Sequence, residues 1–278
     1  MKKASNKSAT STVTFNRKQL ITQRENIWYP EPAREKLLTR LHDIATDPAR
    51  RRHKSLAIIA EPNGGKSSII SRYQELHPQY DGPEGRVIPS ILINMTEMMR
   101  VSDLSIALLE AIGAIKPEDG THSARMKRFI SLAKKVKLGP IFLDEFHDCV
   151  DTQGRGLAFL RLIKGLLNFG LMVVPVGIET VKEVICSDPQ VLYRINLTYG
   201  RLNRIKSRSE VRTLLKKMTE PHNLTVTDQA ANFILESTRG VFGVVLDLIE
   251  ETLLEQGNIS LAALIKQGPM VSGVEKVI

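Results

Sequence analysis

Cysteine is scarce in this sequence, since Cys149 and Cys186 are the only two among 278 residues. Their separation does not match the spacing of metal-ligating pairs, and two cysteines cannot build a disulfide framework. We therefore expect a reducing compartment and a cytoplasmic protein. Long apolar runs are also missing: no stretch could span a bilayer, and the polar residues 1–7 lead into no hydrophobic signal region. We expect neither membrane insertion nor export.

Aromatic residues are few, at 5% of the chain, and acidic residues are outnumbered, which leaves a net charge of +9. The positive charge is concentrated in clusters at residues 50–54, 125–128, 134–137 and 201–208. No aromatic side chains are interleaved with these clusters to stack on unpaired bases. The pattern favours contact with a duplex backbone, although a solvated helix face is the commoner explanation of any single cluster.

A glycine-containing loop joins an apolar run to a helix-like segment. The run covers residues 56–59, and residues 60–68 have the strand, loop and helix order of a phosphate-binding loop. In such loops backbone N–H groups surround the phosphates, Lys66 would reach the β and γ oxygens, and Ser67 would bind Mg²⁺. Ala60 replaces the first glycine of the pattern, so an ordinary turn is the alternative. The candidate ATP-binding residues are Asn63, Gly64, Gly65, Lys66, Ser67 and Ser68.

A second apolar run, at residues 140–143, ends in the adjacent carboxylates Asp144 and Glu145. A buried strand with this ending places a carboxylate where a nucleotide's Mg²⁺ and a water meet. We expect Asp144 to hold the metal together with Ser67, and Glu145 to orient or deprotonate the attacking water. The alternative is an acidic pair that caps the following helix, but this leaves its position after the glycine loop unexplained.

Apolar runs alternate with helical periodicity over the first two thirds of the chain. Runs at residues 87–94 and 171–177 predict further buried strands, so the pattern is that of a parallel α/β sheet. From Ser209 onward the sequence predicts helices alone. We expect a flexible N-terminal arm over residues 1–26, an α/β nucleotide-binding core over 27–208, a small C-terminal helical lid over 209–266, and a mobile tail over 267–278.

This order of elements resembles that of the AAA+ ATPases, and specifically the TniB/TnsC family of transposition regulators. The resemblance covers nearly the whole chain after the arm. It is carried by Ile27-Trp28-Tyr29-Pro30, by Asn63-Gly64-Gly65-Lys66-Ser67, by Phe142-Leu143-Asp144-Glu145-Phe146-His147, and by Val174-Pro175-Val176-Gly177. The middle two are specific to NTPases, but not to this family.

The resemblance implies an AAA+ parallel-sheet P-loop NTPase core with a C-terminal helical lid, which uses ATP and Mg²⁺. It implies a homo-oligomer, a ring or helical filament, that forms on double-stranded target DNA and recruits or activates a transposase. A target-selection protein is the other implied partner, either TniQ-like or part of a CRISPR-associated complex.

Several residue roles follow from the same resemblance. Catalysis would use Lys66, Glu145 and an arginine finger given to the neighbouring subunit, for which Arg194 is the first choice and Arg201 or Arg204 the reserves. A surface arginine in a loop is an equally simple explanation of any one of them. The implied DNA contacts to phosphates lie between the two nucleotide motifs, at Arg100, Thr121, Arg125 and Lys127.

Two departures from the family pattern concern residues that normally sense the γ-phosphate. Ile178 stands where a polar residue is common, and Val244-Val245 where an arginine is expected. Glu179 or Thr180 would replace the first of these in part. We therefore expect hydrolysis that is slow or stimulated by a partner.

Two other functions remain open at this point. A helicase loader of the replication-initiation type would share the nucleotide site but prefer single strands. A non-hydrolysing adaptor would use its nucleotide for structure, which the missing sensor residues favour.

Overall fold

The computed structural model describes residues 15–26, 28–47, 54–96, 100–150, 155–222 and 224–274. The chain divides into two compact units, one formed by Pro30–Asn203 and the other by Met1–Tyr29 with Arg204–Ile278. Each unit has an apolar core of its own. Ile27 and parts of the expected arm and tail lie outside the described residues.

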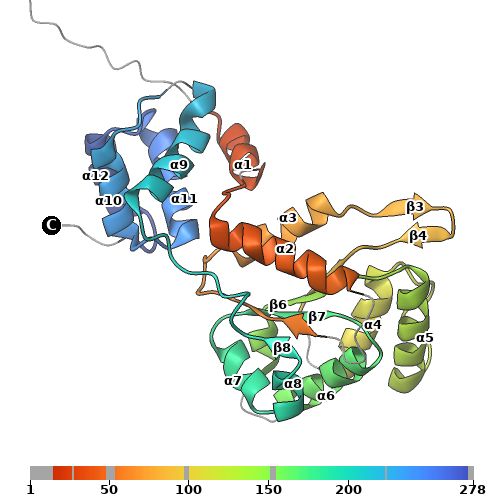
Figure 1. The fold of residues 1–278 in the computed structure, drawn as a ribbon. Helices are drawn as coiled ribbons and strands as arrows, with labels where there is room; N and C mark the ends of the chain where they lie inside the picture. The colour runs from red at the N-terminus through yellow and green to blue at the C-terminus, as the bar shows by residue number, and fades with distance from the viewer. Residues whose placement is uncertain are drawn as a thin grey trace, which may run out of the picture. The chain divides into compact units, whose positions relative to one another are not determined.

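A parallel sheet forms the centre of the Pro30–Asn203 unit (Figure 1). Four strands are paired in the order β2-β7-β6-β5, and β1 pairs with β8. Since Ala57 alone separates β1 from β2, the β8 pairing continues the sheet beyond β2. The strands are β1 (Ser55–Leu56), β2 (Ile58–Ile59), β5 (Ile91–Asn94), β6 (Ile141–Asp144), β7 (Val173–Gly177) and β8 (Ile195–Asn196).

The strand predicted over residues 87–94 was wrong in its extent. Val87 ends β4 (Gly85–Val87), which pairs antiparallel with β3 (Tyr80–Gly82), and the sheet strand β5 begins only at Ile91. Pro89 lies between the two strands and has no N–H with which to continue a ladder. An apolar run was thus divided between a hairpin and the central sheet.

Helices lie on both faces of this sheet, with α2 and α3 on one face and α6, α7 and α8 on the other (Figure 1). Such cover explains why every residue of β7 is buried. The helices of the unit are α2 (Pro32–Thr46), α3 (Lys66–Leu76), α4 (Val101–Ala111), α5 (His122–Lys135), the 3₁₀ helix η1 (Phe146–Val150), α6 (Arg155–Asn168), α7 (Thr180–Cys186) and α8 (Pro189–Leu192).

The other unit contains helices throughout its described part, as expected from Ser209 onward. Ser207 caps the helix that begins at Arg208 by accepting a hydrogen bond from the Glu210 N–H, and the Glu210 carboxylate accepts one from the Ser207 N–H. Its helices are α1 (Arg17–Asn26), α9 (Arg208–Thr219), η2 (Glu220–His222), α10 (Asp228–Thr238), α11 (Phe242–Gln256), α12 (Leu261–Gln267) and η3 (Gly268–Met270).

The stretch expected to be a flexible arm contains the helix α1. Leu20 is fully buried, and Arg24 forms ion pairs with Asp247 at 2.6 Å and Glu250 at 2.8 Å. Burial acts to lower the pKa of Arg24, but hydrogen bonds and charge attraction from the two carboxylates raise it overall. The polar composition of the stretch hid these contacts, because the partners come from the other end of the chain.

The segment expected to be a mobile tail also begins within regular structure. Gln267 ends α12 and is 5% exposed, and Val271 after η3 is 9% exposed. No helix in the described ranges has the length and apolar character needed to cross a membrane.

Candidate nucleotide-binding site

Three sheet strands bring the two nucleotide motifs to one edge. Parallel strands end at the same edge of a sheet, and β2 leads there into the glycine loop, while β6 ends at Asp144. β7 lies between them and ends at Gly177, which pairs in register with Ile59. Residues far apart in the sequence, Ile59, Asp144 and Gly177, thereby lie at the same edge, where phosphates bind in such sheets.

The loop after β2 is tightly curled. Asn63 has φ 58° and Gly65 has φ 86°, which are left-handed conformations. A Cβ on Gly64 would lie 2.7 Å from the Ala60 Cβ and 2.9 Å from the Glu61 oxygen, so this position excludes any larger side chain. Lys66, Ser67 and Ser68 follow as the first turn of α3, where unpaired N–H groups attract anions.

The surroundings of the Lys66 side chain show whether the loop fits a nucleotide. Its side chain is buried, at 7% exposure, and its ammonium lies 3.5 Å from the Glu61 carbonyl oxygen. Within the described parts of the chain no carboxylate lies within ion-pair distance of it. A buried cation is costly without an opposite charge, and a phosphate at the loop would provide that charge. The site therefore fits the group that the sequence predicted.

Arg34 is a residue of this site that the sequence analysis missed. It lies on α2 with 2% exposure, donates from Nη1 to the Ser68 Oγ at 2.9 Å, and donates from Nη2 to the Gly64 oxygen at 3.3 Å. Ser68 in turn donates to the Gly65 oxygen at 2.8 Å. The available signal was an arginine in register with the apolar face that includes Leu37, Leu38 and Leu41.

The acidic pair lies at the end of β6. Asp144 is half-buried and its Oδ1 accepts the Glu145 N–H at 3.0 Å, while Glu145 itself has a left-handed φ of 53°. The His147 Nδ1 lies 3.2 Å from the Glu145 Oε2, although their angle does not meet the geometry of a hydrogen bond. The two carboxylates thus have different surroundings, since Asp144 accepts the Glu145 N–H and Glu145 lies beside His147.

A metal ion would depend on few protein ligands here. The described residues contain no group of three or more His, Cys, Asp or Glu side chains that could hold a metal. Mg²⁺ in nucleotide sites commonly keeps several waters and takes one or two protein ligands plus phosphate oxygens. Ser67 and Asp144, the predicted ligands, would supply that number of protein groups.

The arginine-finger candidates lie at different places. Arg194 precedes β8 and donates to the Asn168 side chain, so it lies at the opposite edge of the sheet from Lys66. Arg201 follows β8, bridges to Ile59, and pairs with Glu179 at 2.9 Å. Arg204 belongs to the helical unit. The structure therefore does not bring Arg194 to this chain's own nucleotide loop.

The structure shows where Ile178 and the Val244-Val245 pair, the two departures from the family pattern, lie. Ile178 directly follows β7, and Val244 and Val245 are buried in the core of the helical unit. Burial acts to raise the pKa of Glu179, but the hydrogen bonds and charges of Arg201 and Lys182 lower it overall. Glu179 is thus ionised and already engaged with two cations.

The four DNA-contact candidates lie at the start of two helices. Arg100 and Lys127 are exposed, and Arg100 is the N-cap residue of α4. Thr121 caps α5 by accepting the Ala124 N–H at 3.3 Å. Arg125 donates to the Ser105 hydroxyl at 2.9 Å and to two loop carbonyls, so its guanidinium holds the α4–α5 connection together.

The sheet order, the curled loop and the acidic strand end define a P-loop protein with the AAA+ fold. Solved structures of 14% identity share this fold. The Aeropyrum pernix ORC2 protein (ADPNP-ADP complexes) matches with TM-score 0.67 over 90% of this chain and 71% of its own. The Aeropyrum pernix ORC1 protein in complex with DNA matches with TM-score 0.62 over 92% and 69%. The Thermotoga maritima RuvB Holliday junction branch migration motor matches with TM-score 0.53 over 89% and 72%.

Residues 19–202 match the family model of the bacterial TniB protein. Because the match spans more than half of the chain, the chain belongs to the TniB family, and the predicted family and fold class are confirmed. No curated protein shows significant similarity to it.

Proposed function

We propose that this TniB-family protein is an ATP-dependent regulator of transposition, which assembles on duplex DNA and recruits or activates a transposase in the cytoplasm. The observation that carries the nucleotide part is the buried Lys66 ammonium, which lies at a curled loop and has no carboxylate beside it in the described residues. The family membership supports the transposition part.

In this proposal each residue of the site has one task. Bound Mg²⁺ supplies positive charge to the phosphate groups. Lys66 binds the β and γ oxygens, and Ser67 and Asp144 hold the metal. Glu145 orients the attacking water and accepts its proton. Arg194 acts on the nucleotide of the neighbouring subunit, in agreement with its distance along the sheet from its own loop.

Slow or partner-stimulated hydrolysis is part of the proposal. Ile178 cannot donate to a γ-phosphate, and the buried Val244 and Val245 fill the helical core where the family pattern has an arginine. Binding of ATP to assembled subunits more tightly than to free ones is enough to drive assembly. A non-hydrolysing adaptor is the second candidate, and these same residues favour it.

The nucleotide proposal is tested by electron microscopy of the full chain with duplex DNA, in ATP, a slowly hydrolysed analogue, ADP or no nucleotide. Wild type and Lys36→Ala, which changes an exposed lysine of α2, should form rings or filaments only with a triphosphate. Lys66→Ala should form none, and Glu145→Gln should form longer-lived assemblies. Normal assembly by Lys66→Ala would refute the site, and assembly on single strands alone would favour a helicase loader.

The duplex contacts are tested by measuring affinity against salt concentration. Arg100→Ala and Lys127→Ala should weaken binding to all duplex sequences alike, and each should reduce the slope of log affinity against log salt by about 1. Lys36→Ala is again the control. An unchanged slope in both variants would place the DNA surface elsewhere on the molecule.

Partner identity is proposed from the family alone. A transposase and a target-selection protein, TniQ-like or CRISPR-associated, should bind the DNA-assembled form more tightly than the free subunit.

A further inference from the structure

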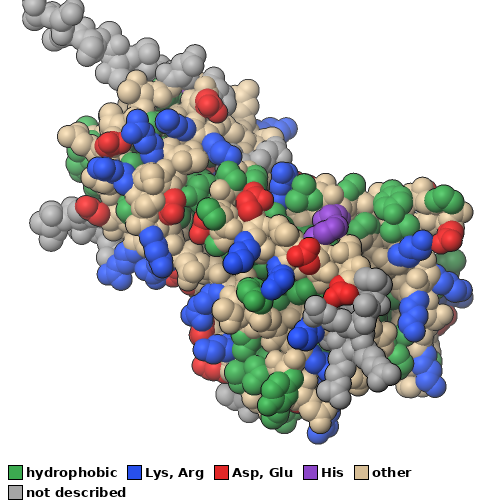
Figure 2. Space-filling view, viewed as in Figure 1, with side chains coloured by type: hydrophobic (Ala, Val, Ile, Leu, Met, Phe, Trp, Pro, Cys, Tyr) green, Lys and Arg blue, Asp and Glu red, His purple; other side chains and the backbone are tan. Residues whose placement is uncertain are grey.

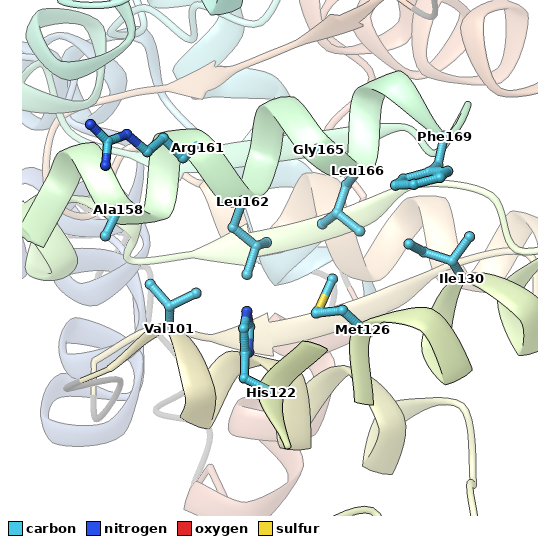
Figure 3. A pocket seen from close by; sticks show the side chains of 10 residues that line it. All are labelled: Val101, His122, Met126, Ile130, Ala158, Arg161, Leu162, Gly165, Leu166 and Phe169. Atoms are coloured by element: carbon cyan, nitrogen blue, oxygen red, sulfur yellow. The ribbon is translucent and has the colours of Figure 1, made fainter. Parts of the chain in front are cut away.

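An open apolar groove lies between α6 on one side and α4 with α5 on the other, within the Pro30–Asn203 unit (Figure 3). Its volume is about 290 Å³. In Figure 3 the side chains of Leu162 and Leu166 point from α6 toward Met126 and Ile130 of α5. Phe169 closes one end and is 54% exposed. Leu162 and Leu166 belong to the core, so Phe169 is the large apolar side chain that the groove leaves exposed. A concave apolar surface of this kind is a candidate binding site.

Gly165 shows that this groove is not shaped by the packing of the unit itself. It lies in the last turn of α6, and a Cβ added to it would meet no atom within 4 Å. Glycine weakens a helix interior relative to alanine, and no neighbour requires it here. The bare backbone at the groove instead lets an outside group approach the helix closely.

Two of the helices around the groove, α5 and α6, carry charge of one sign. α5 carries Arg125, Lys127, Arg128, Lys134 and Lys135, and α6 carries Arg155, Arg161 and Lys164, and neither helix contains an acidic residue. Figure 2 shows Lys and Arg side chains gathered where α5 lies. Among the described residues no carboxylate lies within ion-pair distance of Arg161, Lys127 or Lys134.

Two acidic side chains, Asp103 and Glu110, lie on α4. Asp103 accepts the Arg100 N–H at 2.9 Å and the Ser102 hydroxyl at 3.2 Å. Asp188 caps α8 and lies 4.0 Å from Lys164. The groove therefore presents apolar walls beside two helices, α5 and α6, whose charged residues are all basic.

We propose that this groove docks a segment of a partner protein that carries apolar anchor residues flanked by Asp or Glu. Apolar side chains would fill the space over Gly165, and carboxylates would face Arg161 and Lys134. Duplex DNA fits less well, because an apolar wall offers no donors to phosphate oxygens. The proposal does not depend on nucleotide binding, and it shares Arg125 and Lys127 of α5 with the duplex contacts predicted above.

The test is a selection of randomised 16-residue displayed peptides on the full chain, followed by affinity measurements on the recovered peptides. We expect acidic peptides with apolar residues at helical spacing. Their affinity should fall at least tenfold for Gly165→Leu, which fills the groove, and stay unchanged for Lys36→Leu, the control that adds a leucine at an exposed position of α2. Failure to enrich peptides, enrichment of basic ones, or equal binding to Gly165→Leu would overturn the proposal.

Charge reversal gives a second measurement in case Gly165→Leu does not fold. Arg161→Glu combined with Lys134→Glu should weaken acidic peptides at least tenfold and favour their Glu→Lys counterparts. Two other occupants would also overturn the proposal. A loss of duplex affinity in Gly165→Leu would assign the groove to DNA, and a loss of self-association without DNA, measured by sedimentation velocity, would assign it to a second copy of the chain.

Discussion

Arg34 and Lys66 are both buried cations beside the glycine loop, and they differ in what satisfies them. The Arg34 guanidinium contacts protein atoms, since it donates to the Gly64 oxygen and the Ser68 hydroxyl and its Nε lies 3.5 Å from the Glu31 carboxylate. The Lys66 ammonium has one long contact with a carbonyl in the described residues. Arg34 therefore shapes the loop, whereas Lys66 is left to bind a ligand.

Replacing Arg34 with leucine would keep apolar volume on α2 but remove both hydrogen bonds to the loop, each worth about 1.5–3 kcal/mol when a donor is charged. We expect the affinity for a fluorescent ATP analogue, measured by anisotropy, to fall by at least tenfold. Lys36→Leu on the exposed side of α2 is the control. Equal affinity in Arg34→Leu would show that the loop keeps its shape without Arg34.

Tyr73 connects the loop-led helix α3 to the sheet beneath it. Its ring packs edge-on against Phe142 of β6, with 5.6 Å between ring centroids. Burial raises the pKa of Tyr73 to about 12. At the scale of elements, α3 is thus fixed both by the loop at its start and by an aromatic contact one to two turns later.

This raised pKa predicts a pH effect on stability. The unfolded tyrosine loses its proton near pH 10, while the folded one keeps it until about pH 12. The stabilising contribution is therefore complete below about pH 10 and is lost as the pH rises toward 12. We expect Tyr73→Phe to show a smaller loss of stability than wild type over this range in denaturant melts. Parallel loss in both proteins would contradict the assignment.

Element boundaries show where sequence patterns are insufficient. The acidic-pair strand and the glycine loop were predicted because each carries its own local signal. The apolar run at residues 87–94 carries no comparable signal, so it was predicted as one strand, although Pro89 divides a hairpin from β5. Arg34 was missed because its helix pattern does not reveal that the glycine loop packs against the same face.

In the whole molecule, the helix α1 from the N-terminal part packs with the C-terminal helices in one unit. α1 contacts α9 and α11, and Gln23 donates to the backbone oxygens of Lys217 and Met218. Leu20 is fully buried in this unit's core. The N-terminal helix is therefore part of the C-terminal unit's stability.

Leu20→Ala should accordingly destabilise the helical unit by about 2–5 kcal/mol, the usual result of emptying a buried leucine site. Because a chain with two units need not unfold in one step, hydrogen exchange of peptides from α9 and α11 is the appropriate measurement. Exchange in β6 and β7 should change less. Gln19→Ala, at an exposed position of α1, should change neither. Unaltered protection of α11 in Leu20→Ala would show that α1 does not stabilise the helical unit.

The nucleotide motifs and the parallel α/β class were predictable from the amino-acid sequence, because both depend on residues close together in the chain. The glycine loop needs its conformations at successive residues, and strand burial appears as local apolar runs. Three features became visible in the folded structure: Arg34 contacts the loop, α1 packs with the C-terminal helices, and an apolar groove lies between the basic helices α5 and α6. Each of these depends on contacts between distant segments, which local patterns do not encode.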